Sequence, residues 1–267
     1  MLRSRSVKVR IDKLLVERGL VPTRERAQSL ILAGKVLVNE QKVEKAGTAV
    51  ADDVAVRLLG EDLRYVSRGG LKLEKALEHW RIELTGRTCM DVGTSTGGFT
   101  DCLLQHGAAE VIAVDTGFGQ IDMKLRNNDR VRLLERRNAR YLSRDDISTV
   151  ATGPVTLVVM DVSFISATLV LPAVIEAAFS GESGGGRELV VLVKPQFEVG
   201  RGQVGKGGIV RSVEAQQGAV DKVRDAVAAL GGGEIEVIES PILGGEGNKE
   251  FLLHARFPGT IEEQPTT

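Results

Sequence analysis

The chain has 267 residues, of which 42% are hydrophobic and 27% charged, so it can bury one large core or two modest ones and is not a disordered chain. Its apolar runs fall far short of the ~20 residues of a membrane-spanning helix, and no apolar signal core follows the basic N-terminus. The two cysteines, Cys89 and Cys102, have neither a metal-type nor a redox-type spacing. We therefore expect inert core thiols, no bound metal, no membrane association and a cytoplasmic location.

The net charge of −1 conceals an asymmetry between the two ends of the chain. Residues 1–60 carry twelve Lys/Arg and seven Asp/Glu, whereas residues 61–267 carry 23 and 29. A small basic module joined to a larger acidic one suggests that the basic part contacts a polyanion. Small domains also vary by a few charges without any functional cause, so charge alone leaves a nucleic-acid partner open.

Residues 1–59 are expected to form a small α+β domain. A first helix stops at Gly19, and Thr23 can cap a second helix, which ends at Gly34. Alternating apolar residues from Val36 onward then predict short strands joined by a turn.

Three stretches of this module carry a family resemblance: Arg10-Ile-Asp-Lys-Leu-Leu, Thr23-Arg-Glu-Arg-Ala-Gln-Ser-Leu-Ile and Gly34-Lys-Val-Leu-Val-Asn39. Together they resemble the S4 RNA-binding domain over residues 9–58. The resemblance implies that the module grips structured RNA through shape and phosphate contacts rather than by reading bases. The residues that we expect to contact RNA here are Arg10, Arg24, Arg26, Lys35 and Lys45.

Residues 60–86 are expected to form an interdomain linker and a first helix, Leu71–Trp80. Gly69 and Gly70 precede this helix. They are either a simple bend or a place where the backbone and Arg68 approach an RNA phosphate, and both readings remain open.

From residue 87 to residue 267, predicted strands and helices alternate. The strands are expected at 87–92, 110–115, 131–136, 155–161, 188–194, 233–240 and 250–257, and the helices at 97–107, 119–127, 144–150, 165–179 and 212–230. Alternation of this kind predicts an α/β, doubly wound, mostly parallel sheet of Rossmann-like type. The last two strands are adjacent in sequence and therefore expected to be antiparallel, which fits the methyltransferase version of the fold.

A glycine-rich turn follows the first strand of this domain and opens a helix, the place where open parallel sheets bind ligands. The turn reads D-x-G-x-x-x-G-G rather than the G-x-G-x-x-G of dinucleotide-binding folds, and its acidic start suits a cationic amino-acid ligand. We therefore expect S-adenosyl-L-methionine, with a nicotinamide cofactor as the alternative. The residues expected at the cofactor are Asp91, Gly93, Ser95, Gly97, Gly98 and Phe99, with Asp115 holding the ribose.

Other cofactor contacts follow later strands. Phe118 and Asn138 are candidates for holding adenine, although Phe118 could equally be a core residue. Arg140, close to Asn138, is a further candidate for RNA phosphates. Phe164 either lines the methionine or adenine pocket or packs in the core. Asp161, which precedes it in the same motif, is also expected at the cofactor.

Two charged residues end central strands: Asp161 the fourth and Lys194 the fifth. Because an isolated buried charge is costly, these two side chains are expected to pair. A lysine placed there can remove a proton from a ribose 2′-hydroxyl, with Lys72 as a second cation and Glu250 as an orienting carboxylate. Purely structural pairing is the alternative.

These four residues complete a second resemblance. Lys72, Asp161, Lys194 and Glu250 match the K-D-K-E tetrad of FtsJ/RrmJ-type RNA 2′-O-methyltransferases. Over residues 9–257 the chain resembles the TlyA family, historically labelled haemolysin A, through Tyr65-Val-Ser-Arg-Gly-Gly-Leu-Lys-Leu, Asp91–Thr100, Asp161-Val-Ser-Phe-Ile-Ser and Val193-Lys-Pro-Gln-Phe-Glu-Val-Gly. The resemblance implies 2′-O-methylation of cytidine in ribosomal RNA, of one subunit or both.

Other functions compete with this one. A non-catalytic RNA-binding assembly factor would keep the basic module without needing the tetrad, and a small-molecule methyltransferase would not need the basic module. A membrane-lysing protein would need a strongly amphipathic or long apolar segment. The helix expected at 165–179 lacks basic residues and is explained more simply by packing on the sheet.

Overall fold

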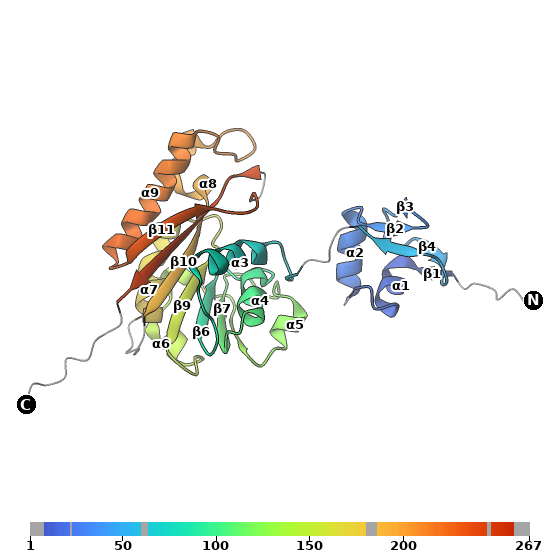
Figure 1. Cartoon of the computed structure of the whole chain (residues 1–267), viewed down its shortest axis with the longest axis horizontal. Helices are drawn as coiled ribbons and strands as arrows, with labels where there is room; N and C mark the ends of the chain where they lie inside the picture. The colour runs from blue at the N-terminus through green and yellow to red at the C-terminus, as the bar shows by residue number, and fades with distance from the viewer. Residues whose placement is uncertain (1–7, 22, 60–63, 180–185, 245–246, 259–267) are drawn as a thin grey trace, which may run out of the picture. The chain divides into compact units, whose positions relative to one another are not determined.

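A computed structural model describes residues 8–21, 23–59, 64–179, 186–244 and 247–258 (Figure 1). The chain divides into two compact units, 1–64 and 65–267. Tyr65 and the helix that follows it belong to the second unit, because Tyr65, Leu73 and Leu77 are buried in that unit's core. The helix expected within residues 60–86 thus packs in the second unit. Residues 60–63 lie outside the described part of the chain.

The first unit packs two helices on small sheets. Helices α1 (Ile11–Glu17) and α2 (Arg24–Leu32) share a core with strand β2 (Val36–Val38). The expected cap of α2 is confirmed, because the Thr23 hydroxyl accepts a hydrogen bond from the Arg26 amide at 3.2 Å. β2 pairs with β3 (Gln41–Lys42) and β5 (Val56–Leu58), and β1 (Lys8–Arg10) pairs with β4 (Ala49–Ala51).

The second unit is built on a seven-stranded sheet with the order β11-β12-β10-β9-β6-β7-β8. Its strands are β6 (Thr88–Val92), β7 (Glu110–Val114), β8 (Val131–Leu134), β9 (Val155–Met160), β10 (Arg187–Val193), β11 (Gly233–Glu239) and β12 (Phe251–Phe257). β12 runs antiparallel to both β10 and β11, and the other pairings are parallel. The predicted doubly wound, mostly parallel fold is confirmed.

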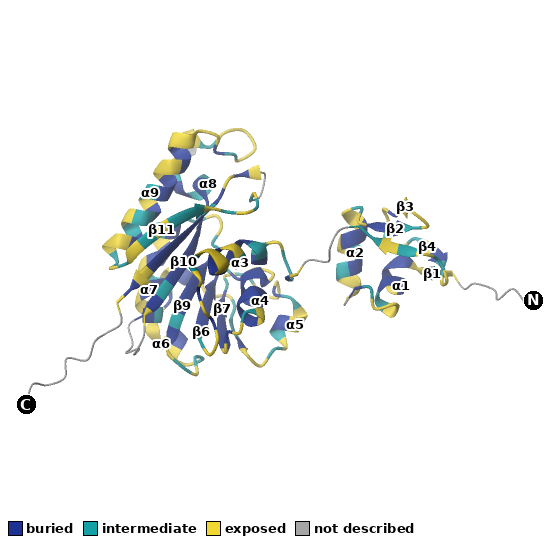
Figure 2. Cartoon of the chain, in the orientation of Figure 1, coloured by how far each residue is buried: buried dark blue, intermediate teal, exposed yellow. Residues whose placement is uncertain are grey.

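Helices cover both faces of this sheet, and each face has its own apolar core. On one face lie α3 (Gly69–Trp80), α4 (Gly98–Gln105) and α5 (Met123–Arg126), and on the other α6 (Arg144–Ser148), α7 (Ala167–Phe179) and α9 (Val213–Ala229) (Figure 1). Figure 2 shows the central strands almost entirely buried and the outer helix faces exposed. Cys89 and Cys102 are both buried, and burial raises the pKa of the Cys89 thiol to about 12.

Two elements differ from the sequence prediction. The helix expected at 119–127 is only the short α5, because Gly119 has a positive φ of 72° and the Asp122 side chain caps a helix that begins at Met123. A short helix, α8 (Pro195–Glu198), was not predicted, although proline is favoured at the first position of a helix. It turns the chain away from the sheet directly after Lys194.

Strand register explains why the charged residues meet. In the parallel pair β9 and β10, Met160 lies opposite Val191, and in the antiparallel pair β10 and β12, Val193 lies opposite Phe251. Asp161, Lys194 and Glu250 directly follow or precede these strand ends. All three residues therefore lie at the same end of the sheet, the end at which the parallel strands finish.

Helix α7 offers a matched test of this packing. Leu171 is fully buried against the sheet, whereas Leu169, two residues away, is 48% exposed. We expect Leu171→Ala to lower the free energy of unfolding by about 2–5 kcal/mol, because it leaves a cavity in the core. Leu169→Ala should change it by no more than about 0.5 kcal/mol. Urea unfolding of both variants measures the difference, and equal losses would contradict the assigned faces.

Candidate active site

The glycine-rich turn between β6 and α4 forms the floor of the site. Gly93 has a φ of +88°, and a Cβ at this position would lie 2.5 Å from the carbonyl oxygen of Asp161. Only glycine allows the turn to approach the end of β9 so closely. This contact brings the motif after the first strand of the sheet against the motif after the fourth.

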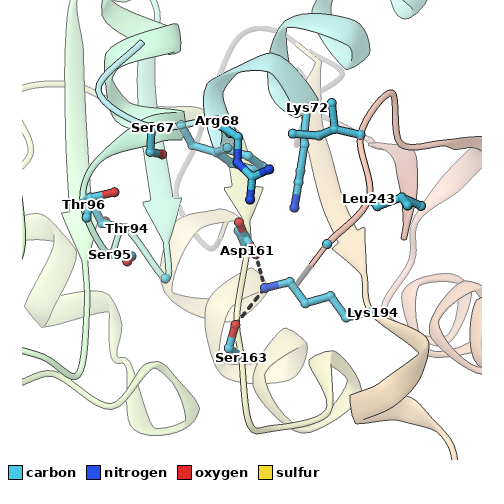
Figure 3. A pocket seen from close by; sticks show the side chains of 16 residues that line it. Ser67, Arg68, Lys72, Thr94, Ser95, Thr96, Asp161, Ser163, Lys194 and Leu243 are labelled. Atoms are coloured by element: carbon cyan, nitrogen blue, oxygen red, sulfur yellow. Dashed lines mark hydrogen bonds and ion pairs between the residues drawn. The ribbon is translucent and has the colours of Figure 1, made fainter. Parts of the chain in front are cut away.

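Two adjoining cavities open above this floor. One, of about 290 Å³, is lined by Ser67, Arg68, Gly69, Lys72, Gly93, Thr94, Ser95, Thr96, Gly98, Phe99, Asp161, Ser163, Lys194, Ile242, Leu243 and Gly244 and is called here the lysine cavity (Figure 3). The other, of about 410 Å³, is lined by Asp115, Asn138 and Phe164 among others and is called the carboxylate cavity. Gly93, Ser95, Asp161 and Ser163 line both. The two cavities therefore share one wall.

Lys194 is fixed at that shared wall. Its Nζ lies 2.5 Å from Asp161 Oδ1 and donates a hydrogen bond to the Ser163 hydroxyl at 2.7 Å (Figure 3). The expected pairing of Lys194 with Asp161 is thus present. A buried ion pair of this kind needs such additional hydrogen bonds to offset the loss of hydration.

Lys72 forms a second buried ion pair. Its Nζ lies 2.5 Å from Glu250 Oε2, and both side chains are almost completely buried. Lys72 itself lines the lysine cavity, while Glu250 is not among the residues lining it. Figure 3 shows Arg68 and Lys72 with their cationic ends directed into the cavity. The structure therefore brings the tetrad together as two pairs, with Glu250 behind Lys72.

Asp91 lies beneath the glycine-rich turn, outside both cavities. It is fully buried and lines neither cavity, so its carboxylate is not exposed to a ligand there. Asp91 Oδ2 accepts a hydrogen bond from the Thr100 hydroxyl at 2.6 Å, and Oδ1 has no hydrogen-bond partner. Burial, the dominant cause, raises the pKa of Asp91 to about 7. The residue supports the turn from below rather than lining the site.

Asp115 lies in the wall of the carboxylate cavity, where ribose hydroxyls could be held. Its two oxygens accept hydrogen bonds from the backbone amides of Ser95 at 2.7 Å and Gly117 at 2.6 Å. These bonds orient the carboxylate, and each oxygen keeps capacity for a further donor.

The remaining residues of the turn are divided between ligand and packing roles. Ser95, Gly98 and Phe99 line the lysine cavity. Gly97 lines neither cavity, and a Cβ there would lie 2.3 Å from a methyl carbon of Leu125. Gly97 therefore allows α5 to pack against the turn instead of contacting a ligand.

The three later cofactor candidates are placed differently. Asn138 lines the carboxylate cavity and also caps the next turn by accepting from the Arg140 amide. Phe164 lines the same cavity, is 93% exposed and has a φ of +65°, so it is not a core residue. Phe118 lines neither cavity and is not in the core. Its ring is 63% exposed and lies under the Arg136 guanidinium.

In the first unit, the expected RNA contacts have distinct surroundings. Arg10 and Arg24 both pair with the fully buried Asp12, at 2.9 and 3.0 Å, and keep about half of their side chains exposed. Lys35 and Lys45 are exposed, and Arg26 is half-buried. Within the second unit, Arg68 and Arg140 are exposed, and Arg68 lines the lysine cavity.

Three residues that help to shape the site were not identified from the sequence. Ser163 binds Lys194, and Gly244 lies so close to the Glu250 carboxylate that a Cβ would collide with it. Asn248 accepts from the Val210 amide at 3.0 Å and donates to the Gly208 carbonyl at 2.9 Å, which ties the loop after α8 to the start of β12. The position of Asn248, two residues before Glu250, was the feature of the sequence that could have identified it as part of the site.

Within the described ranges, no group of three or more His, Cys, Asp or Glu side chains is arranged to hold a metal ion. No helix in the part of the chain that the structure describes is both long and apolar enough to cross a membrane.

The buried Asp91 carboxyl predicts a pH dependence. Its pKa is about 7 in the folded protein and ~3.9 in unfolded chains, so the folded state holds the proton more tightly. Stability should therefore fall as pH rises from about 4 through 7. Asp91→Asn removes this contribution, so the free energy of unfolding of the variant minus that of the unmodified protein should be larger at pH 8 than at pH 5. Asp225→Asn, at an exposed position of α9, is the control, and a difference independent of pH would contradict the assignment.

Comparison with known proteins agrees with this geometry. The chain is 45% identical over 250 residues to the 16S/23S rRNA (cytidine-2′-O)-methyltransferase TlyA of Mycobacterium tuberculosis, covering 93% of this chain and 90% of that protein. It is also 45% identical over 258 residues to "Putative rRNA methyltransferase YqxC" of Bacillus subtilis, covering 97% and 89%. A solved structure, "Putative hemolysin from Streptococcus thermophilus", superposes with a TM-score of 0.71 at 41% identity and covers 98% of this chain and 93% of that one.

The family models divide the chain as the structure does. The S4 domain model matches residues 9–55, and the model described as FtsJ-like methyltransferase matches residues 65–257. The chain belongs to the FtsJ-like methyltransferase family and carries an S4 domain at its N-terminal end.

Proposed function

We propose that this chain transfers a methyl group from S-adenosyl-L-methionine to the 2′-hydroxyl of a cytidine in ribosomal RNA. The observation that carries the proposal is the wall shared by the two cavities, where Lys194 is held by Asp161 and Ser163. One cavity can take the cofactor and the other the ribose that receives the methyl group. The Mycobacterium tuberculosis relative is named for this reaction on 16S and 23S rRNA.

The carboxylate cavity has the chemistry that S-adenosyl-L-methionine requires. Asp115 would accept hydrogen bonds from the ribose hydroxyls, and Asn138 and Phe164 would border the adenosine. Gly93 and Ser95 form the floor, and Asp161 supplies negative charge beside the shared wall. When bound, the cofactor supplies an electrophilic methyl carbon on a sulfonium.

The lysine cavity would hold the target ribose with its 2′-oxygen toward the shared wall. In this reading Lys194 first gives up its own proton to solvent, leaving its ion pair with Asp161, and then receives the proton of the 2′-hydroxyl. Lys72, fixed by Glu250, stabilises negative charge that develops on the oxygen. Asp161 and Ser163 hold the Lys194 amine in one position, so alignment of the reacting atoms contributes much of the rate.

RNA would be held by cations of both units. The residues proposed to contact phosphates are Arg10, Arg24, Arg26, Lys35, Lys45, Arg68 and Arg140. Asp12 fixes the guanidinium groups of Arg10 and Arg24 before RNA binds, which reduces the entropy lost on binding. An rRNA substrate would place the reaction in the cytoplasm.

The role of Lys194 is tested by transfer of radiolabelled methyl groups to isolated 30S and 50S subunits. Lys194→Ala should lower the rate by at least about a hundredfold, the range of a lost general base. Lys194→Arg should be similarly slow, because arginine keeps the charge but cannot release a proton at neutral pH. Lys75→Ala, at an exposed position of α3, should retain the rate.

The label should lie on a ribose and block alkaline cleavage after one cytidine. If Lys194→Arg were fully active, the general-base role would be wrong and Lys194 would act only through its charge. If no subunit were labelled and the cofactor did not bind, a non-catalytic RNA-binding factor would replace the proposal.

The phosphate contacts predict a salt dependence. Each of Arg10→Ala, Arg24→Ala, Lys45→Ala, Arg68→Ala and Arg140→Ala should reduce the slope of log affinity against log salt by about 1. Fluorescence anisotropy with an rRNA fragment measures the slopes. Arg224→Ala, which removes a surface ion pair with Asp221 on α9, is the control, and unchanged slopes in all five variants would refute the assignment.

A further inference from the structure

The acidic catalytic unit contains one strongly basic segment. Residues 123–144 carry eight Lys/Arg and two Asp/Glu, whereas the rest of 65–267 carries 14 Lys/Arg and 25 Asp/Glu. The segment runs from α5 through β8, the edge strand of the sheet, to the start of α6. Its charge is therefore concentrated at one edge of the fold.

Part of this positive charge is neutralised within the protein. Arg126 pairs with Glu135 at 2.5 Å, Arg132 with Glu110 at 3.0 Å, and Arg137 with Asp146 at 3.2 Å. Arg136, Arg140 and Arg144 are exposed, and the described residues offer none of them an ion-pair partner. These three guanidinium groups remain available to an external anion.

Two exposed aromatic rings lie among these arginines. The Arg136 guanidinium carbon is 4.3 Å from the centre of the Phe118 ring, and that of Arg140 is 5.8 Å from the centre of the Tyr141 ring. The rings are 63% and 71% exposed. An exposed ring beside a guanidinium offers a flat π face next to positive charge, a combination that suits a nucleotide, because the ring can stack on the base and the cation can bind the phosphate.

Backbone contacts hold Phe118 and Arg136 at the rim of the carboxylate cavity. The Arg136 amide donates to the Gly117 carbonyl at 3.0 Å, and the Gly119 amide donates to Glu135 Oε1 at 2.7 Å. Gly117 lines the carboxylate cavity, whereas Phe118, the next residue, does not. The same loop thus faces the cavity on one side and solvent on the other.

We propose that Phe118, Arg136, Arg140, Tyr141 and Arg144 form a second RNA-binding surface, here called the arginine–aromatic surface, which stacks unpaired nucleotides of the substrate outside the reacting cytidine. Exposed aromatic rings bind any base through its π face, and the arginines neutralise the phosphates between stacked bases. The inference rests on the proposed function, because it assigns this surface to the same RNA. It also replaces adenine binding as the role of Phe118.

The test compares the full-length protein with Phe118→Ala and Arg136→Ala, using a fluorescent 12-nucleotide oligouridylate and a 12-base-pair RNA duplex as probes. Phe118→Ala should weaken binding of the oligouridylate about tenfold, with little effect on the duplex, because only unpaired bases can stack on the ring. It should leave the salt slope unchanged. Arg136→Ala should weaken binding and also reduce the slope by about 1.

Two controls separate this surface from the rest of the protein. Leu169→Ala, which removes an exposed apolar side chain from α7, should bind both probes normally. Calorimetric titration of Phe118→Ala with S-adenosylhomocysteine should give the affinity of the unmodified protein. A loss of cofactor affinity with normal binding of oligouridylate would overturn the proposal and return Phe118 to the adenine site.

Methyl transfer to ribosomal subunits by the unmodified protein is measured in parallel. If the protein transfers methyl groups but Phe118→Ala and Arg136→Ala bind oligouridylate as well as it does, the arginine–aromatic surface is wrong and the proposed function stands. If the variants lose RNA affinity and the unmodified protein transfers nothing, the surface stands and the proposed function fails. Failure of the unmodified protein to bind oligouridylate would refute the surface.

Discussion

The site depends on the requirement that buried lysines be paired. Lys72 and Lys194 are largely withdrawn from water, and in the resting site an ion pair with a carboxylate offsets the cost of burying the charge of each. Their partners, Glu250 and Asp161, come from different strands, and Lys72 comes from a helix on one face of the sheet. The two ion pairs therefore connect α3, β9, β10 and β12 at the end of the sheet where the parallel strands finish. Removing one partner would leave an uncompensated charge as well as an incomplete site.

Close backbone contacts complete this arrangement. A Cβ at Gly98 would lie 2.2 Å from the Ser67 hydroxyl oxygen, so α4 can approach the segment before α3 only because this residue has no side chain. The same segment carries Arg68 into the lysine cavity. Glycine in this turn thus serves the assembly of the cavity wall as much as any contact with a ligand.

The sequence predicted the architecture well because alternating strands and helices, with two final strands adjacent, permit few topologies. It also predicted the pairing of Lys194 with Asp161, since each directly follows one of two parallel strands that finish at the same end of the sheet. It did not predict the burial of Asp91, because a motif fixes a position along the chain but not which side of the turn faces solvent. The sequence also left the surroundings of Phe118 open, for a related reason. A lone aromatic residue in a loop has no periodicity that tells core from surface.

Charge is distributed unequally between the two edge strands of the sheet, so a polyanion would bind one edge in preference to the other. Strand β11 lies at one edge and carries Glu234, Glu236 and Glu239, while β8 lies at the opposite edge within the basic segment. Two of the β11 carboxylates are paired, Glu234 with Arg256 and Glu239 with Lys249, so the main asymmetry is the positive charge near β8. That charge attracts phosphates although the net charge of the whole chain is only −1. Residues that follow β7 and β8 line the carboxylate cavity together with residues that follow β6 and β9, so one side of the cavity borders the basic segment. On the proposed function, RNA drawn to β8 would therefore reach the cofactor cavity first, and the cations of the lysine cavity, across the shared wall, would continue its path toward Lys194.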